Sequence, residues 1–330
     1  MTESGTTAPP PTGGGGPTEG IPHDQPPTGA DAMIVCDRLV RIYSGDGIEV
    51  QALQGLDLLL AEGELAALIG AAGSGKSTLM NILAGLDTPT AGAVWVADHN
   101  LGAMTAKERL AYRRSVVGFI WQQTSRNLLP YLTARQNVLL PMRFTPLRRR
   151  ERLRRASVLL QTLGIAHCAD RTPDRMSGGE QQRAAIATAL ANQPKVLLAD
   201  EPTGELDSST AQDVFSALQT ANTQLGATVL VVTHDPAVSS QVRRTIAIRD
   251  GRTSSETIRH TATDEQGRTA LHAREYATLD RAGRIQLPRE MTTRLRMRHR
   301  VQLQEEPDHI GVWPDQAAAH QERDHPTPNS

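Results

Sequence analysis

The residues best suited to chemistry lie in one glycine-rich loop, which reads Gly70-Ala71-Ala72-Gly73-Ser74-Gly75-Lys76-Ser77. Every fixed position of the phosphate-binding pattern G-x-x-x-x-G-K-[ST] is filled. Glycines allow a tight turn in which successive backbone N–H groups point into one concavity, and the following helix adds its positive N-terminal end. Lys76 offers a point charge for the β- and γ-phosphates, and the Ser77 hydroxyl suits Mg²⁺. The loop therefore predicts a site for the polyphosphate of a nucleotide, in preference to a plain turn.

The segments on either side of the loop fit this interpretation. The apolar run 65–69 predicts a buried strand, and residues 78–85 have helical spacing and end on a glycine. Strand, loop and helix occur in the order that a phosphate-binding loop requires.

A second motif delivers two carboxylates at the end of an apolar strand, Lys195–Ala199. Asp200 and Glu201 follow this strand, at the position where open α/β sheets bind ligands. We expect Asp200 to coordinate a metal directly or through water, and Glu201 to act as general base toward the attacking water. The alternative is an ordinary helix cap before Pro202.

Two neutral or titratable groups also follow strands. Gln122 comes after the strand 119–121, and its amide could sense metal and water without adding charge. His234 comes after the strand 229–232 and could contact the γ-phosphate and orient the water. The alternative for His234 is polar surface, but its place at the end of a core strand favours a functional role.

A second anion-binding helix end is predicted at Ser177-Gly178-Gly179, with Glu180 one residue further on, before the helix 182–190. One nucleotide does not easily need two such helix ends from one chain. A pair of chains could therefore share the nucleotide.

Size and composition exclude several classes of protein. A chain of 330 residues can hold one large α/β domain and a small second one, and its net charge of −1 gives no global attraction to nucleic acid or lipid. Two cysteines, Cys36 and Cys168, suit a reducing cytosol and argue against a disulfide framework or a zinc ribbon. His167 could form half of a metal site with Cys168, although a chance neighbour is favoured. The pattern predicts neither a membrane span nor a signal peptide.

The pattern divides the chain into five parts. Residues 1–32 and 316–330 are expected to be disordered tails, 33–255 one α/β domain with a helical subdomain at about 123–190, 256–274 a polar linker and 275–315 a small second unit. An arginine-rich run at 148–155 is interpreted as a solvated helix face, with anionic lipid or a partner protein as the alternative. Within the large domain the expected strands are Met33–Tyr43, Val50–Leu60, Glu64–Ile69, Ala93–Ala97, Val116–Trp121, Lys195–Ala199 and Ala227–Val232, with a helix at 208–225 and a closing hairpin at 245–255.

Taken together, these motifs resemble those of ATP-binding cassette (ABC) ATPases. The phosphate loop, Gln122, the run 176–183 (Met-Ser-Gly-Gly-Glu-Gln-Gln-Arg), Asp200-Glu201 and His234 occur in that family's order. Segments 118–122, 127–133 and 199–204 are similar to the lipoprotein-release, macrolide-export and cell-division branch. The resemblance implies an α/β P-loop NTPase fold with a mixed sheet core, an antiparallel β subdomain and a helical subdomain, followed here by a small β-rich domain.

The resemblance also implies the roles of individual residues. Two copies would pair head to tail and bury two ATP molecules, with Mg²⁺ as the metal. Tyr43 would stack on adenine, with plain strand packing as the alternative, and Asp207 would lie in the loop that crosses the dimer interface. The implied catalytic residues are Glu201, His234 and Gln122; the Mg²⁺ ligands are Ser77, Gln122 and Asp200; the residues acting in trans are Ser177, Gly178, Gly179 and Glu180; the nucleotide contacts are Tyr43, Gly70, Ala71, Ala72, Gly73, Ser74, Gly75, Lys76, Ser77 and Thr78.

The C-terminal unit carries a separate resemblance. Residues 276–288 alternate strand, glycine turn and strand, 289–297 fit a short helix, and 301–303 and 310–312 fit two more strands. This pattern resembles the AbrB-like swapped-hairpin domain, which forms intertwined dimers that often bind DNA. The arginine-rich half before Val301 makes contact with DNA phosphates an alternative. Dimerisation is favoured, because acidic residues at 305, 306 and 308 offset the positive charge.

The favoured function is an ATP-hydrolysing subunit that dimerises on ATP and drives a separate membrane permease of the export, lipoprotein-release or mechanotransmission type. The expected place is the cytoplasmic side of the cell membrane. The alternatives are a soluble ABC ATPase and a nucleotide-dependent DNA-binding regulator acting through residues 275–315. A single cassette without a long insert favours transport, and nothing in the sequence identifies the cargo.

Overall fold

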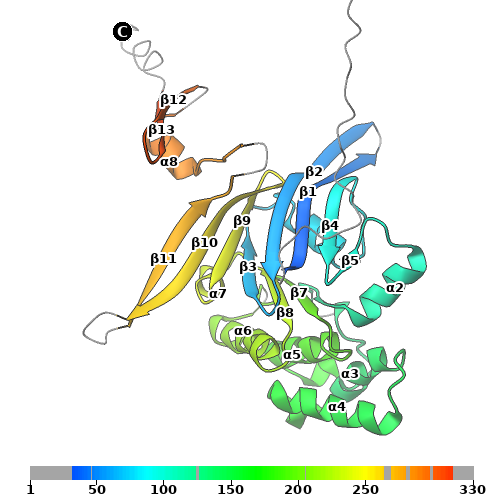
Figure 1. Cartoon of the computed structure of the whole chain (residues 1–330). Coiled ribbons are helices and arrows are strands. Elements are labelled where there is room, and N and C mark those ends of the chain that lie inside the picture. Colours follow the sequence, from blue (N-terminus) through cyan, green and yellow to red (C-terminus); the bar gives the residue numbers. More distant parts are fainter. Residues whose placement is uncertain are drawn as a thin grey trace, which may run out of the picture.

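A computed structural model of the chain describes residues 32–45, 47–123, 126–204, 206–263, 269–279, 283–297 and 300–314. The expected N-terminal tail lies outside these ranges except for Ala32, and the expected C-terminal tail lies wholly outside them. Within the described residues the strands form three sheets (Figure 1).

The central sheet is mixed, with parallel strands at its centre and an antiparallel ribbon at one edge. Strands β6, β7, β8, β3 and β9 lie side by side in this order and run parallel, whereas β9, β10 and β11 pair antiparallel. Parallel strands end at the same edge, so the residues that follow β3, β6, β7 and β8 are brought together. In spatial order the strands of this described sheet are β11 (Thr269–Ala277), β10 (Arg252–Thr263), β9 (Arg244–Arg249), β3 (Leu65–Ile69), β8 (Thr228–Val232), β7 (Val196–Asp200) and β6 (Val117–Ile120).

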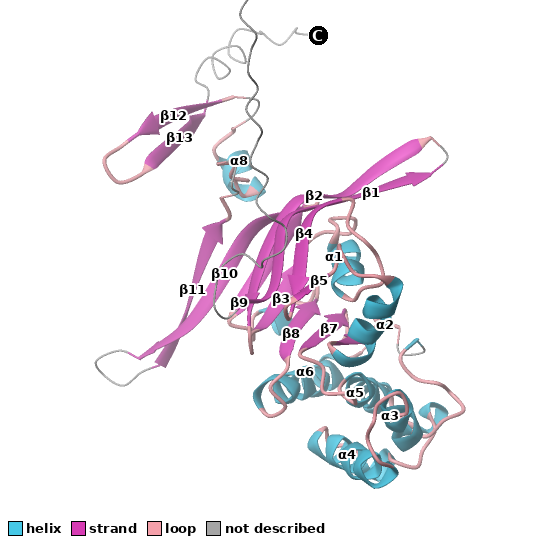
Figure 2. Ribbon diagram, turned by 45° about the vertical axis from the view of Figure 1, so that its right-hand side comes forward, coloured by secondary structure: helices cyan, strands magenta, loops and turns pink. Residues whose placement is uncertain are grey.

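Both faces of the central sheet are covered, which is why its inner strands read as continuous apolar runs. On β7, Val196 and Leu198 belong to the apolar core shared with α1 and the antiparallel sheet. Leu197 and Ala199 alternate with them and belong to the core shared with the helical layer. Figure 2 shows these two layers on either side of the parallel strands.

The layer beside α1 is a four-stranded antiparallel sheet, counted over the described residues, with the order β2-β1-β4-β5. The buried side chains of α1 and the fully buried Tyr112 of α2 pack into the same core. The elements of this layer are β1 (Ala32–Gly45), β2 (Ile48–Ala61), α1 (Lys76–Leu83), β4 (Ala91–Val96), β5 (His99–Asn100) and α2 (Ala106–Ser115). The sequence pattern did not predict α2, whose start is marked by a capping box between Thr105 and Glu108.

The opposite layer is helical. Its helices α3, α4 and α5 lie within the part of the chain where helical spacing was predicted, and capping boxes at Thr133 and Ser177 begin two of them. Helix α6 begins at the predicted residue, with Asp207 as its N-cap. The bounds are α3 (Ala134–Met142), α4 (Arg149–Thr162), η2 (Ala166–Cys168), η3 (Pro173–Arg175), α5 (Gly178–Ala189), α6 (Ser208–Thr223) and α7 (Pro236–Ser239).

The expected polar linker at 256–274 is not irregular. Strands β10 and β11 pair along it, from Ser255 opposite Ala277 to Thr263 opposite Thr269. Polar composition suggested a linker, but the run is rich in threonine, a β-branched residue that favours strands. Residues 272–276 are exposed, so this edge strand needs no apolar pattern.

The C-terminal unit contains α8 (Arg289–Arg294) and a hairpin of β12 (Val301–Glu305) and β13 (Ile310–Pro314), at the positions that the sequence predicted. In the described part of the expected strand pair within 276–288, residues 276 and 277 belong to β11, and an isolated bridge joins Leu279 to Ile285. Among the described helices, none combines the length and the apolar character needed to cross a bilayer.

Candidate active site

The phosphate-binding loop connects β3 to α1 and needs glycine at two of its positions. A Cβ at Gly70 would lie 2.3 Å from the Ile248 carbonyl oxygen, and a Cβ at Gly75 would lie 2.6 Å from that of Ala52. Gly75 is the N-cap of α1, with a φ of 103°. The surrounding backbone therefore packs so closely on the loop that side chains at these positions are excluded.

Lys76 holds its ammonium group over the loop. Its Nζ donates hydrogen bonds to the carbonyl oxygens of Gly70 at 2.8 Å and Ala71 at 2.9 Å, and the side chain is buried. The loop residues Ala71, Ala72 and Gly73 and the Ser77 side chain at the start of α1 are exposed, whereas Ser74 is buried and Thr78 half-buried. A positive charge thus lies beside exposed backbone at the N-terminus of a helix, which is an arrangement suited to an anion.

Glu201 is held by two of the predicted site residues. Its Oε2 accepts a hydrogen bond of 3.0 Å from Gln122 Nε2, and its Oε1 lies 3.3 Å from His234 Nδ1. These residues follow β7, β6 and β8 in turn, so the parallel sheet brings together side chains that are far apart in the sequence. Glu201 has a φ of 46°, and its N–H donates to the Val232 carbonyl. This left-handed backbone turns Glu201 out of the strand.

Asp200 ends β7 next to Glu201 and is partly buried. Burial and the negative charge of Glu201 raise the pKa of the Asp200 carboxyl, while Lys76 offsets part of this rise. Two adjacent carboxylates at a half-buried strand end fit a hard divalent cation, whose charge would relieve their repulsion. The exposed Ser77 hydroxyl and the Gln122 amide supply the other oxygen atoms of the predicted Mg²⁺ set.

Tyr43 lies on β1 and is 39% exposed. Its hydroxyl donates a hydrogen bond of 2.7 Å to Asp87, and the Arg41 guanidinium lies 4.4 Å from the ring centroid. Arg41 and Asp87 also form an ion pair at 2.8 Å. The ring is therefore held by its hydroxyl and partly accessible. The contact with Asp87 could not be predicted from local patterns, because 44 residues separate the two.

Ser177 caps helix α5, and the two glycines that follow it pack against the start of α6. A Cβ at Gly178 would lie 3.1 Å from Leu206 Cδ2, and one at Gly179 would lie 2.4 Å from Thr210 Cγ2. The Gly179 position is the tighter of the two, so even a methyl group there requires Thr210 to move. Figures 1 and 2 show α5 with the helical layer, and Figure 2 shows α1 beside the antiparallel strands, in the other core.

Asp207 is fixed by the first turn of α6. Its carboxylate accepts hydrogen bonds from the backbone N–H and the hydroxyl of both Ser209 and Thr210. These bonds, led by that of the Ser209 hydroxyl, hold the pKa of Asp207 far below its usual range. Asp207 thereby has its carboxylate fixed by hydrogen bonds, and its neighbours Leu206 and Thr210 pack on the glycines of α5.

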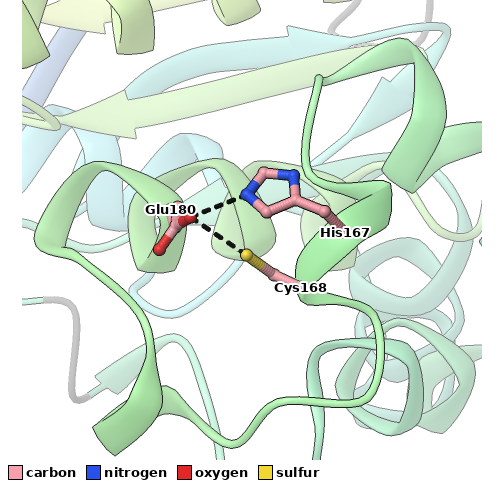
Figure 3. A group of neighbouring side chains, drawn as sticks. All are labelled: His167, Cys168 and Glu180. Carbon is pink, nitrogen blue, oxygen red and sulfur yellow. Dashed lines mark hydrogen bonds and ion pairs between the residues drawn. The ribbon is translucent and has the colours of Figure 1, made fainter.

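Glu180 has more contacts than a capping residue needs (Figure 3). Its Oε2 accepts the Ser177 N–H at 2.8 Å, while its Oε1 contacts His167 Nε2 at 2.8 Å and Cys168 Sγ at 3.1 Å. These hydrogen bonds, led by the one from Cys168, lower the pKa of Glu180 to about 2. Burial and the contact with Glu180 raise the pKa of Cys168 to about 11.

Two asparagines position the backbone on either side of Gln122, and their role was not predicted from the sequence. Asn127 bonds the backbone N–H and carbonyl of Trp121 at 2.8 and 2.9 Å. Asn137 is buried and bonds the N–H of Leu129 and three carbonyl oxygens between residues 129 and 133. Polar side chains inside an apolar run, as at Asn137, are the signal that could have revealed them.

A cavity of about 420 Å³ opens beside this segment, between β6 and helices α2, α3 and α5. Its lining mixes aromatic and basic side chains, including Trp121, Phe144, Arg114 and Arg126. The Arg114 guanidinium lies 4.9 Å from the centroid of Phe144. The cavity adjoins Gln122 in the chain and is suited to an amphipathic partner segment.

Comparisons with known proteins agree on one family. The model of the ABC transporter family matches residues 53–204. The macrolide export ATP-binding/permease proteins MacB of Shigella flexneri and of Escherichia coli K12 are each 46% identical over 211 residues, which is 64% of this chain and 32% of theirs. The chain thus spans about a third of the length of these curated relatives.

Solved structures indicate the same family, and here the match covers nearly the whole of the related chain. The dimeric structure of MJ0796, described as a bacterial ABC transporter cassette, is 39% identical, with a TM-score of 0.62, and the match covers 68% of this chain and 97% of that one. A second MJ0796 dimer, in a post-hydrolysis state with ADP and Pi, is 38% identical, with the same TM-score and the same coverage of both chains.

Proposed function

The chain belongs to the ABC transporter family of ATPases and has the cassette fold that its motifs predicted, and from this premise we propose that two copies bind and hydrolyse ATP between them to drive a separate integral-membrane permease. The observation that carries the proposal is the Glu201 carboxylate, held by Gln122 and His234 at the end of the strand beside the phosphate loop. This arrangement orients a carboxylate base. It is what activation of a water molecule against a terminal phosphate requires.

The phosphate loop supplies the binding part of the proposal. Lys76 would exchange its carbonyl contacts for the β- and γ-phosphates, and the exposed backbone N–H groups of the loop would bind the same oxygens. Residues 70–78 would thus hold the triphosphate, and Tyr43 would stack on the base. The Tyr43 hydroxyl bond to Asp87 supports this role, because it fixes the orientation of a partly exposed ring.

Mg²⁺ would be held by Ser77, Gln122 and Asp200. When bound, it would neutralise the charge of the phosphate oxygens. The adjacent carboxyl groups of Asp200 and Glu201 support a cation there, because a positive charge would relieve their mutual repulsion. Gln122 would then contact both the metal and Glu201. His234 would orient the water and contact the γ-phosphate.

The second helix end would act in trans. Ser177, Gly178, Gly179 and Glu180 begin α5 in the helical layer and would face the γ-phosphate bound by Lys76 of the other copy. Asp207, in the loop packed on those glycines, would cross the interface. The dimers of MJ0796 support this pairing for a relative of nearly the same cassette length.

The permease would contact the cavity beside Gln122. Its aromatic and basic lining suits a short amphipathic helix, and Asn127 links that lining to the backbone next to Gln122. Binding at the cavity would therefore shift the backbone next to Gln122, whose side chain donates a hydrogen bond to Glu201. The place implied is the cytoplasmic face of the membrane, and the MacB relatives, which are named for macrolide export, support an export type of system.

We further propose that the C-terminal unit, 275–315, dimerises. The register of β12 and β13 puts Val301, Leu303, Ile310 and Val312 on one face of the hairpin. Leu303 is 66% exposed and Ile310 is 68% exposed, so a second copy would bury an apolar face that one copy leaves in water. Such pairing would raise the effective concentration of the two ATPase domains.

A mixing experiment tests sharing of the ATP site. Lys76→Ala and Ser177→Arg proteins should each be inactive, because each removes one part of every site. Mixed dimers contain one intact site, formed by Lys76 of one copy and Ser177 of the other. Phosphate release should reappear on mixing, and a mixture as inactive as its components would contradict action in trans.

Charge introduced into the C-terminal hairpin tests the second part. Leu303→Arg should weaken nucleotide-free self-association of the full chain in sedimentation, whereas Gln302→Arg, on the opposite face, adds the same charge and should not. Equal self-association of the two variants would contradict the proposed face. A salt-dependent shift of duplex DNA by the full chain would instead favour the regulator.

A further inference from the structure

One cluster of metal-ligating side chains lies outside the catalytic arrangement around Glu201. His167 Nε2, Cys168 Sγ and a Glu180 carboxylate oxygen come from η2 and α5, and these three atoms lie within 4.8 Å of one another (Figure 3). His167 Nε2 is 2.8 Å and Cys168 Sγ 3.1 Å from Glu180 Oε1. Two of the ligands are neighbours in the sequence, and the third arrives from the next helix.

The three ligand types form a set that is chemically selective. Thiolate sulfur, imidazole nitrogen and carboxylate oxygen together are typical of Zn²⁺ and not of Mg²⁺ or Ca²⁺, which take oxygen ligands. Bonds of about 2.0–2.3 Å to a tetrahedral ion put neighbouring ligand atoms roughly 3.3–3.7 Å apart. The observed spacings need only small side-chain movements to reach this geometry.

We propose that His167, Cys168 and Glu180 bind a zinc-class divalent cation. Binding displaces the thiol proton of Cys168 to solvent and uses the His167 tautomer that carries its proton on Nδ1. A fourth position is left for water. The Glu180 oxygen that faces the ion is Oε1, so Oε2 keeps its bond to the Ser177 N–H.

The surroundings of the cluster give an entry path for an ion and place one cationic side chain beside the sulfur. The side chain of His167 is 55% exposed, so an ion can reach the cluster from solvent at this residue. Cys168 is buried. The Arg171 guanidinium lies 3.8 Å from Cys168 Sγ and stabilises the sulfur when it is deprotonated. An ion bound here would connect η2 to the first turn of α5, beside the serine and glycines proposed to act in trans.

Metal titration of the full chain without nucleotide tests this proposal independently of ATP hydrolysis. The metal-free protein is titrated with Zn²⁺ against a chromophoric chelator, and with Co²⁺ as a spectroscopic probe. We expect one Zn²⁺ per chain and a thiolate-to-cobalt charge-transfer band. Cys168→Ser should abolish the band, and both Cys168→Ser and His167→Ala should weaken Zn²⁺ binding at least tenfold.

Cys36 provides a matched control, because it is the chain's other cysteine and is buried in the core shared by β1 and α1. Cys36→Ser should keep both the cobalt band and the affinity. Zn²⁺ binding that is unchanged in Cys168→Ser and His167→Ala, or absent from the wild-type chain, overturns the proposal. If Cys168→Ser fails to fold by circular dichroism, the exposed His167→Ala decides the question.

Discussion

Replacing Glu201 by glutamine removes the proposed base while changing little else at the site. In the structure Glu201 Oε2 accepts from Gln122, and Oε1 lies beside His234. A glutamine can keep its carbonyl oxygen toward Gln122 and turn its amide toward His234. The side chain thus keeps its size and its hydrogen bond from Gln122, and it loses the negative charge and the ability to accept a proton.

The expected loss follows from this limited change. A positioned general base contributes about 10²–10⁴ to a rate, which corresponds to about 3–5 kcal/mol of activation free energy. Nucleotide binding should persist, because the phosphate loop is untouched and Lys76 keeps its place. Loss of the Glu201 charge also removes a negative group from beside the proposed γ-phosphate position, so ATP should bind at least as tightly.

Phosphate release at saturating Mg²⁺-ATP measures the rate, and equilibrium binding of ATP measures affinity. The control is Glu62→Gln, which makes the same chemical change at an exposed position in the turn before β3. Glu201→Gln should retain an ATP-bound dimer in gel filtration, and Glu62→Gln should turn over like wild type. Hydrolysis by Glu201→Gln at the wild-type rate would refute Glu201 as the base, and loss of ATP binding would refute the separation of binding from chemistry.

Four other changes have expected outcomes. Lys76→Ala removes a charged donor from the phosphate loop and should weaken ATP about 100-fold, measured by equilibrium binding. Gly179→Ala places a Cβ 2.4 Å from Thr210 Cγ2 and should cost about 1–3 kcal/mol of unfolding free energy in urea, and adding Thr210→Ser, which removes that methyl group, should restore most of it. Phe215→Ala empties a fully buried site on α6 and should cost about 3–5 kcal/mol in the same assay. The pKa of Glu180 is about 2 in the folded state, below its usual 4.5, so its carboxylate stabilises the fold above about pH 4.5 and loses that effect as the pH falls toward 2. In urea titrations at a series of pH values, the stability of Glu180→Gln should therefore fall less steeply than that of wild type between pH 4.5 and 2.

Local sequence patterns were enough to predict the chemistry and its order along the chain. The phosphate loop, the carboxylates after β7 and the serine–glycine start of α5 are local patterns, because a few adjacent residues fix a turn, a strand end or a cap. The apolar runs of β3, β7 and β8 were also predicted as strands, since a strand buried on both faces needs no alternation of apolar and polar residues. The family, and with it the cassette fold, followed from these motifs.

The tertiary structure alone decided which of these residues meet. Gln122, Glu201 and His234 converge because the spatial strand order places β6, β7 and β8 side by side, and a strand order is set by long-range packing that no local pattern records. The contact of Cys168 with Glu180 is also long-range, because it arises where η2 packs on α5. From the sequence alone, His167 and Cys168 were therefore interpreted as chance neighbours. The β10–β11 ribbon was missed because an exposed edge strand needs only paired backbone, so its polar side chains carry no signal of the partner strand.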